Sequence, residues 1–129
     1  MKGLNEFKRA DKLLHVHYQN FGDVKILLNA LDALSKSLKE GITNLEGEEK
    51  NMFKKFVDVY RVKRARKLSS EMSQILKNYQ ESSLCFARKE KYIVCDSNLG
   101  FKEINFKLLE NYFQKVGKFL KNGEVVTNA

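Results

Sequence analysis

Five cationic side chains crowd into the seven positions of residues 61–67, within the stretch YRVKRARKLSS. On a helix, Lys63, Arg66 and Lys67 project away from the apolar stripe that follows, whereas Arg61 falls at the centre of that stripe. Lysine and arginine neutralise phosphates and release counterions, and arginine adds a bidentate geometry. The run therefore predicts either a phosphate-contacting surface or the solvated face of a helix.

Arg61 needs its own explanation, because a bare cation in an apolar core is costly. It should either pair with a carboxylate, for which Asp58 is nearest in the sequence, or mark the point where the core stops. Three cations further along the chain would join the surface if the fold brings them near. The predicted nucleic-acid or anion-binding residues are Lys63, Arg64, Arg66, Lys67, Arg88, Lys89 and Lys91.

Two histidines stand two positions apart, His15 and His17 in HVHYQN, and raise the question of a metal site. On a helix such residues point about 200° apart, so they cannot share a metal ion. Neither a Cys-x-x-Cys nor a His-Glu-x-x-His spacing completes a site. We expect no metal and no cofactor, and interpret both histidines as helix-surface residues.

The spacing of Arg9 and His15, Arg-x5-His, resembles the Arg-x4–6-His signature of HEPN-type helical ribonucleases. The resemblance rests on these two residues and implies metal-independent RNA cleavage. On a continuous helix, however, the two side chains project about 120° apart. This enzyme hypothesis therefore ranks third, behind two non-catalytic ones.

The two cysteines, Cys85 and Cys95, are too few for a disulfide framework. No histidine lies near either of them in the sequence to complete a Cys–His pair. We interpret both as inert thiols of a reduced, cytoplasmic protein, and we predict no catalytic residues.

The positive charge is distributed unevenly along the chain. Residues 1–60 hold ten Lys or Arg against nine Asp or Glu, whereas residues 61–129 hold fourteen against seven. Such asymmetry predicts a polyanionic partner, either nucleic acid or an acidic protein. No apolar run approaches the roughly 20 residues that cross a bilayer, so we expect no membrane partner.

The elements that must position these residues are predicted to be helices, because the 129 residues include no proline. Residues 4–21 form a first amphipathic helix, which Gly22 ends, and Asp23 caps the next helix. The apolar stripe of the first helix comprises Leu4, Phe7, Leu14, Tyr18 and Phe21. The stripe of the second comprises Val24, Leu27, Leu28, Leu31, Leu34, Leu38 and Ile42.

Gly41 suggests the end of the second helix, and Thr43 with Glu46 has the capping-box spacing that opens a third. That third helix is predicted at residues 44–83, about 60 Å long. Its apolar face turns by about a quarter turn at the basic run. Before the run the face comprises Phe53, Phe56, Val57 and Tyr60, and after it Ala65, Leu68, Met72, Ile75, Leu76 and Tyr79.

The stretch KYIVCDSNLGFKEI allows two structures. It predicts a short β-hairpin at residues 92–104 with a turn at residues 97–100, or else helix continues to about Cys95. Asn105 then caps a last helix, which should stop at Gly123. Residues 124–129 are expected to be a flexible tail.

Together these patterns predict an all-α, four- to five-helix bundle with one long central helix, as a single domain over residues 1–123. The expected function is a non-catalytic binding module whose basic second half contacts nucleic acid or another acidic partner. No recognisable recognition motif supports sequence-specific reading of bases. The alternative is a protein–protein adaptor or a homo-oligomer formed through helix packing, in which the basic run is only solvated.

Overall fold

The computed structural model describes residues 3–47, 52–81, 86–88, 91–95 and 101–128. Side chains are described throughout this part except at residues 24, 52–58, 80–81, 86–88, 91–95, 101–102 and 122–128. Among the described residues, no helix combines the length and apolar character needed to cross a membrane.

The chain is mainly helical, with one small sheet. Its helices are α1 (Leu4–Lys12), the π-helix η1 (Leu13–His17), α2 (Tyr18–Phe21), α3 (Val24–Gly47), α4 (Met52–Glu81) and α5 (Phe106–Asn128). Its strands are β1 (Phe86–Arg88), β2 (Lys91–Cys95) and β3 (Phe101–Ile104). The three segments α1, η1 and α2 follow one another without a break, and we call them the N-terminal rod.

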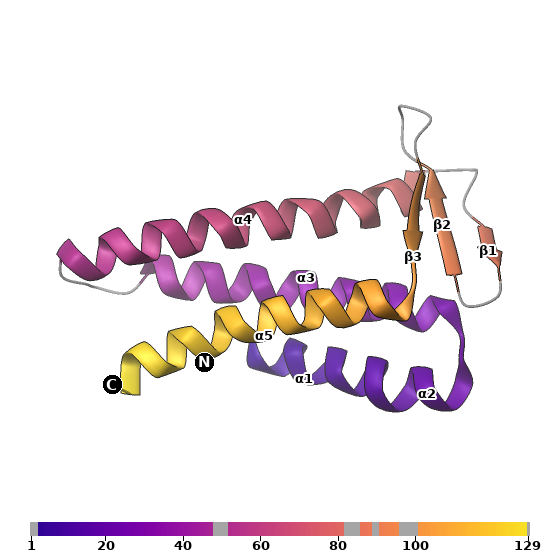
Figure 1. Cartoon of the computed structure of the whole chain (residues 1–129), viewed down its shortest axis with the longest axis horizontal. Coiled ribbons are helices and arrows are strands. Elements are labelled where there is room, and N and C mark those ends of the chain that lie inside the picture. The colour runs from indigo at the N-terminus through magenta and orange to yellow at the C-terminus, as the bar shows by residue number, and fades with distance from the viewer. Residues whose placement is uncertain (1–2, 48–51, 82–85, 89–90, 96–100, 129) are drawn as a thin grey trace.

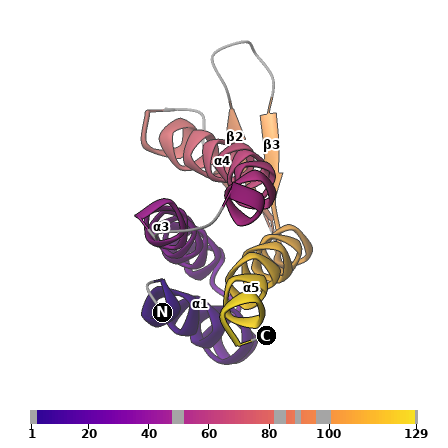
Figure 2. The ribbon, with the colours of Figure 1, turned by 90° about the vertical axis from the view of Figure 1, so that its left-hand side faces the viewer.

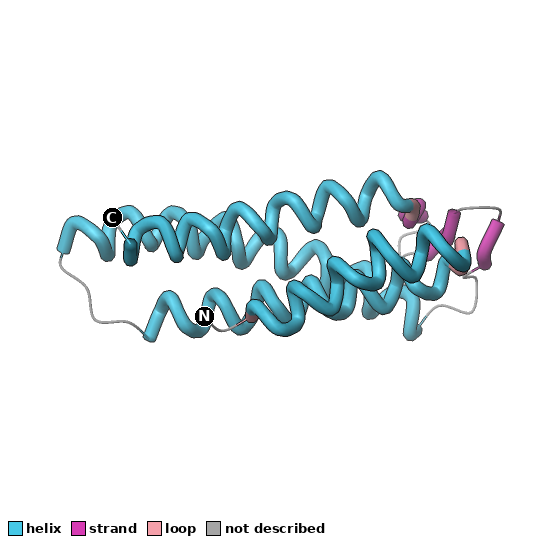
Figure 3. The backbone as a smooth tube through the Cα atoms, turned by 90° about the horizontal axis from the view of Figure 1, so that it is seen from below, coloured by secondary structure: helices cyan, strands magenta, loops and turns pink. Residues whose placement is uncertain are grey.

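The N-terminal rod, α3, α4 and α5 run alternately up and down to form a bundle (Figure 1). Seen along the bundle, these four units surround a shared core (Figure 2). The strands gather at one end, between the end of α4 and the start of α5 (Figure 3). The predicted all-α bundle with one long helix is therefore confirmed.

Helix α3 supplies the centre of the core, because it contacts the N-terminal rod, α4 and α5. Its predicted leucine stripe is buried, and so are the small residues Ala30 and Ala33 beside it. A helix with three neighbours must be apolar over more than one narrow stripe. The buried leucines of α3 are Leu27, Leu28, Leu31, Leu34 and Leu38, each worth about 1.5–3 kcal/mol of burial.

The predicted break between the first two helices is confirmed. Gly22 has a φ of +62°, a left-handed conformation that glycine adopts without strain. Asp23 caps the next helix, because its Oδ1 accepts a hydrogen bond from the Lys25 backbone N–H at 2.9 Å. The predicted stripe is wrong at Phe21, whose side chain is 74% exposed. The π-helix η1, which we did not predict, has wider turns, so a stripe counted at 100° per residue drifts after it.

The predicted end of the second helix is wrong. Helix α3 continues through Gly41 to Gly47, and the Thr43 hydroxyl donates to the Lys39 carbonyl at 3.0 Å instead of capping a new helix. Gly41 is a packing residue, because a Cβ atom there would lie 2.8 Å from Leu120 Cδ2. The glycine thus allows α3 and α5 to approach closely rather than ending the helix.

The predicted long helix is present as α4, but it begins at Met52 and spans 30 residues, about 45 Å. The apolar face after the basic run is confirmed, with Ala65, Met72 and Ile75 buried. The face before the run falls largely outside the described side chains. Its last member, Tyr60, is 68% exposed, so the prediction that it packs in the core is wrong.

The hairpin prediction is confirmed over the alternative of a continuing helix. Strands β2 and β3 pair antiparallel, with Tyr92 opposite Ile104, while the predicted turn lies outside the described residues. Strand β1, which we did not predict, adds to the other edge of β2. Ile104 is fully buried and joins the sheet to the helical core.

The predicted cap of the last helix is also confirmed, because Asn105 Oδ1 accepts a hydrogen bond from the Leu108 backbone N–H at 2.9 Å. Leu109, Tyr112 and Val116 bury the inner face of α5. The helix does not stop at Gly123, as we expected, but continues to Asn128.

Truncating Leu31 to alanine should lower the free energy of unfolding by about 2–5 kcal/mol, because it empties the centre of the α3 core. Asn29, which is exposed on the same helix, provides the control. Asn29→Ala should leave stability within about 0.5 kcal/mol of the parent. Chemical denaturation of the three proteins measures the difference, and equal midpoints for Leu31→Ala and the parent would contradict the role of α3.

Candidate anion-binding groove

A groove of about 530 Å³ lies between α4 and α5. It forms because α4 and α5 each pack extensively on α3 but touch one another only sparsely. Buried Leu38 of α3 and buried Ala65 of α4 contribute to its lining, together with half-buried Leu68 and Phe119. The groove therefore has an apolar lining supplied by all three helices.

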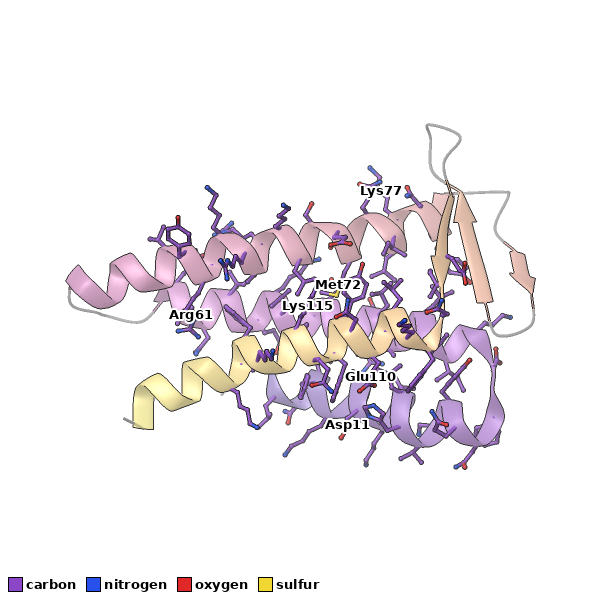
Figure 4. All side chains as sticks on the ribbon, viewed as in Figure 1. Asp11, Arg61, Met72, Lys77, Glu110 and Lys115 are labelled. Carbon is purple, nitrogen blue, oxygen red and sulfur yellow. The ribbon has the colours of Figure 1, made fainter. Side chains whose placement is uncertain are left out.

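Five cationic side chains line this groove. Arg61, Arg64 and Lys67 come from α4, and Lys115 and Lys118 come from α5. Residues three and four apart lie on one face of a helix, so each helix presents its cations to the same side. Arg61 extends from α4 toward α5, and Lys115 lies on the part of α5 that runs beside α4 (Figure 4).

Two side-chain contacts join α4 to α5 across the groove. The Arg61 Nη2 group donates to the Phe119 carbonyl at 3.4 Å, and its guanidinium carbon lies 5.8 Å from the centroid of the Phe119 ring. The Tyr112 hydroxyl donates to Glu71 Oε1 at 3.0 Å. Arg61 and Glu71, the α4 residues of these contacts, are ten positions apart and therefore about 15 Å apart along the helix.

Tyr112 is suited to its role as a donor to Glu71. Burial raises the pKa of Tyr112 above its usual range, and the hydrogen bond to Glu71 and its negative charge raise it further. The phenol therefore stays protonated and keeps its hydrogen bond. Glu71 is the acidic residue among the described residues that line the groove, and its carboxylate contacts the Tyr112 hydroxyl.

Arg61 does not end as a bare cation in the core. It is half-buried and contacts the backbone and ring of Phe119 on α5. The side chain of Asp58, its expected partner, lies outside the described side chains. The position of Arg61 on the core-facing side of α4 is what allows it to reach across to α5.

The predicted anion-binding residues divide into separate groups. Arg64 and Lys67 line the groove. Lys63 is exposed elsewhere on α4, and Arg66 forms an ion pair with Glu46 of α3. Arg66 thereby lines a different groove, of about 740 Å³, between the end of α3 and α4, where the carboxylate of Glu46 offsets its charge.

For the predicted cations of the strands, only backbone positions are described. Arg88 and Lys91 are opposite one another in the β1–β2 pair, and Lys89 lies outside the described residues. The sheet is at the end of α4 away from Arg61 (Figure 4). The membership of Arg88, Lys89 and Lys91 stays a prediction, whereas Lys115 and Lys118, which the sequence analysis missed, line the groove. Their i, i+3 spacing is visible in the sequence, but nothing local shows that α5 runs beside the basic run.

His15 is more than the helix-surface residue that we predicted. Its Nδ1 lies 2.5 Å from Asp11 Oδ1 on α1, and its Nε2 lies 2.6 Å from Glu110 Oε2 on α5. The ring also makes an edge contact with Phe113, at 4.9 Å between centroids. Because both ring nitrogens face carboxylates, a doubly protonated imidazolium satisfies both contacts.

Opposing effects act on the pKa of His15, whose side chain is 33% exposed. Partial burial lowers the pKa, but the hydrogen bonds to Asp11 and Glu110 and their negative charges outweigh burial and raise it above 6.5. The charged ring therefore links the N-terminal rod to α5.

The structure does not bring Arg9 and His15 into one site. Arg9 pairs with Glu6 at 3.0 Å and reaches Asp32 of α3 at 3.7 Å, whereas His15 faces α5. The described residues include no group of three or more His, Cys, Asp or Glu side chains that could hold a metal ion. Cys85 lies outside the described residues, and only the backbone of Cys95 is described, in β2.

No protein-family model, curated protein or solved structure matches this chain. The described residues that line the groove between α4 and α5 are five cations, one carboxylate and an apolar set.

The stabilising contact of His15 should depend on pH. Because its pKa is raised in the folded state, the contribution is fully present below pH 6.5 and is lost as the pH rises through the folded-state pKa. His15→Gln should therefore destabilise the protein by up to about 1 kcal/mol near pH 6 and by less near pH 9.

His17→Gln provides the matched control, because the exposed His17 has no carboxylate contact among the described residues. It should leave the pH profile of stability like that of the parent. Thermal unfolding at several pH values compares the three proteins. A constant difference between His15→Gln and the parent at every pH would show that the ring acts by shape rather than by charge.

Proposed function

We propose that the protein is a non-catalytic helical binding module and that the groove between α4 and α5 binds nucleic acid through its phosphates. The observation that carries the proposal is the meeting of cations from two helices around one groove, whose described lining residues include five cations and one carboxylate. A cleft lined by one sign of charge with apolar walls focuses its electrostatic field and attracts the opposite charge.

The arrangement of the cations supports this proposal better than their number alone. Arg64, Lys67, Lys115 and Lys118 form no ion pair with another described residue, whereas Arg66 outside the groove is paired with Glu46. Cations held close together repel one another, and a bound polyanion relieves that repulsion. Phosphate contacts of this kind carry no sequence information, so binding should tolerate unrelated base sequences.

An acidic protein partner would be the alternative ligand of the same charged surface, and a protein–protein adaptor or homo-oligomer would leave that surface only solvated. Nucleic acid is favoured because its regularly spaced phosphates can occupy cations on both helices at once. We extend the proposal to a cytoplasmic location, in which both cysteines stay reduced.

Replacing Lys67, Lys115 and Lys118 together by glutamine should weaken nucleic-acid binding about equally for unrelated sequences. The slope of log affinity against log salt should become shallower by up to about 0.7–0.9 per lost phosphate contact. Glutamine has a helix propensity close to that of lysine, so the fold should persist. Fluorescence anisotropy at several salt concentrations measures both quantities, and circular dichroism verifies the fold.

The matched control removes the same charge outside the groove, with Lys8, Lys63 and Lys77 replaced by glutamine. All three are exposed, and Lys77 projects from α4 away from α5 (Figure 4). The control should keep most of the affinity and of the salt slope. Equal losses in the two triple variants would mean that net charge, not the groove, drives binding. Absence of binding at low salt, together with a dimer mass, would support the adaptor instead.

A further inference from the structure

Tyr60 is a large aromatic side chain that the core does not use, since it is 68% exposed. Helical spacing places it in one row with Arg64 and Lys67, at i, i+4 and i+7. Arg61, Ala65 and Leu68 form the neighbouring row, nearer the core. Arg64 and Lys67 line the groove, and Tyr60 lies one helical turn before Arg64 in the same row, just beyond the lining residues.

We propose that the groove binds single-stranded nucleic acid, with a base stacked on Tyr60 and the backbone following the cations of α4 and α5. This inference rests on the proposed function and specifies its ligand. Proteins that bind single strands without sequence preference combine a positively charged groove with an exposed aromatic ring on which bases stack. The α4 edge supplies both features, with the ring one helical turn before Arg64.

The apolar lining favours a single strand over a duplex. In a duplex the base faces are stacked on one another, so a protein meets mainly phosphates and sugars. A single strand exposes its bases to apolar and aromatic groups. Half-buried Leu68 of α4 and Phe119 of α5 offer such a surface between the cations. A duplex would contact the cations at the edges of the groove but leave this lining and the Tyr60 ring unused.

The width of the site points to the same ligand. Arg61 and Tyr112 each span from one helix to the other, so the groove is no wider than one side chain can bridge. A duplex is much broader, since its major groove alone is about 12 Å wide.

The test compares two polyanions: a single-stranded oligonucleotide of mixed sequence and inorganic polyphosphate, which has the charge but no bases. Tyr60→Ala should weaken oligonucleotide binding at least about fivefold and leave polyphosphate binding within about twofold. Tyr60→Phe, which keeps the ring, should bind the oligonucleotide like the parent. Phe21→Ala removes an equally exposed ring from α2, outside the groove, and should change neither affinity.

Each outcome bears on a different part of the proposal. If Tyr60→Ala weakens both ligands equally or neither, or if a duplex of the same sequence binds more tightly than the single strand, the single-strand inference is wrong. The proposed function survives those results, because phosphate binding by the groove remains. If the parent binds neither polyanion at low salt, the proposed function fails as well. Circular dichroism of every variant separates loss of binding from loss of fold.

Discussion

The packing of three helical units on one shared helix, α3, is the constraint from which the rest of this structure follows. Helix α3 contacts the N-terminal rod, α4 and α5, and its small residues let these neighbours come close. At Gly41 the approach is so tight that a Cβ atom would collide with Leu120 of α5. Because α4 and α5 both bury their apolar faces against α3, little apolar surface remains for them to bury against each other. The groove between them is the consequence.

Polar contacts join the helices where apolar packing leaves them apart. Arg61 and Tyr112 reach between α4 and α5, and His15 links the N-terminal rod to α5. Contacts of this kind near the surface are each worth about 1 kcal/mol or less, which is small beside the buried leucines of α3. Burial of apolar side chains therefore supplies most of the stability of the bundle. Directional hydrogen bonds help to fix the relative position and rotation of the helices.

The lysines of the groove do not contribute to the stability of the core. Helix packing does not need Lys67, Lys115 or Lys118, all of which are exposed, and their mutual repulsion slightly opposes folding. The bundle tolerates these lysines because the repulsion between exposed charges is weak in water. A helical bundle by itself implies no function. What distinguishes this one is the cationic groove and, one helical turn before Arg64 on α4, the exposed ring of Tyr60.

The sequence by itself determined the features that depend on nearby residues. The leucine stripe of α3, the break at Gly22 and the cap at Asn105 were all readable, because helical period, glycine conformation and capping act within a few positions. Only the tertiary structure decided that Gly41 packs instead of ending a helix, and that Tyr60 faces solvent. It also decided which cations act together: Lys115 and Lys118 join Arg64 across about fifty residues of chain, while Arg66 turns to Glu46. Such groupings depend on how helices lie side by side, and that arrangement is set by burial summed over the whole core rather than by any local pattern.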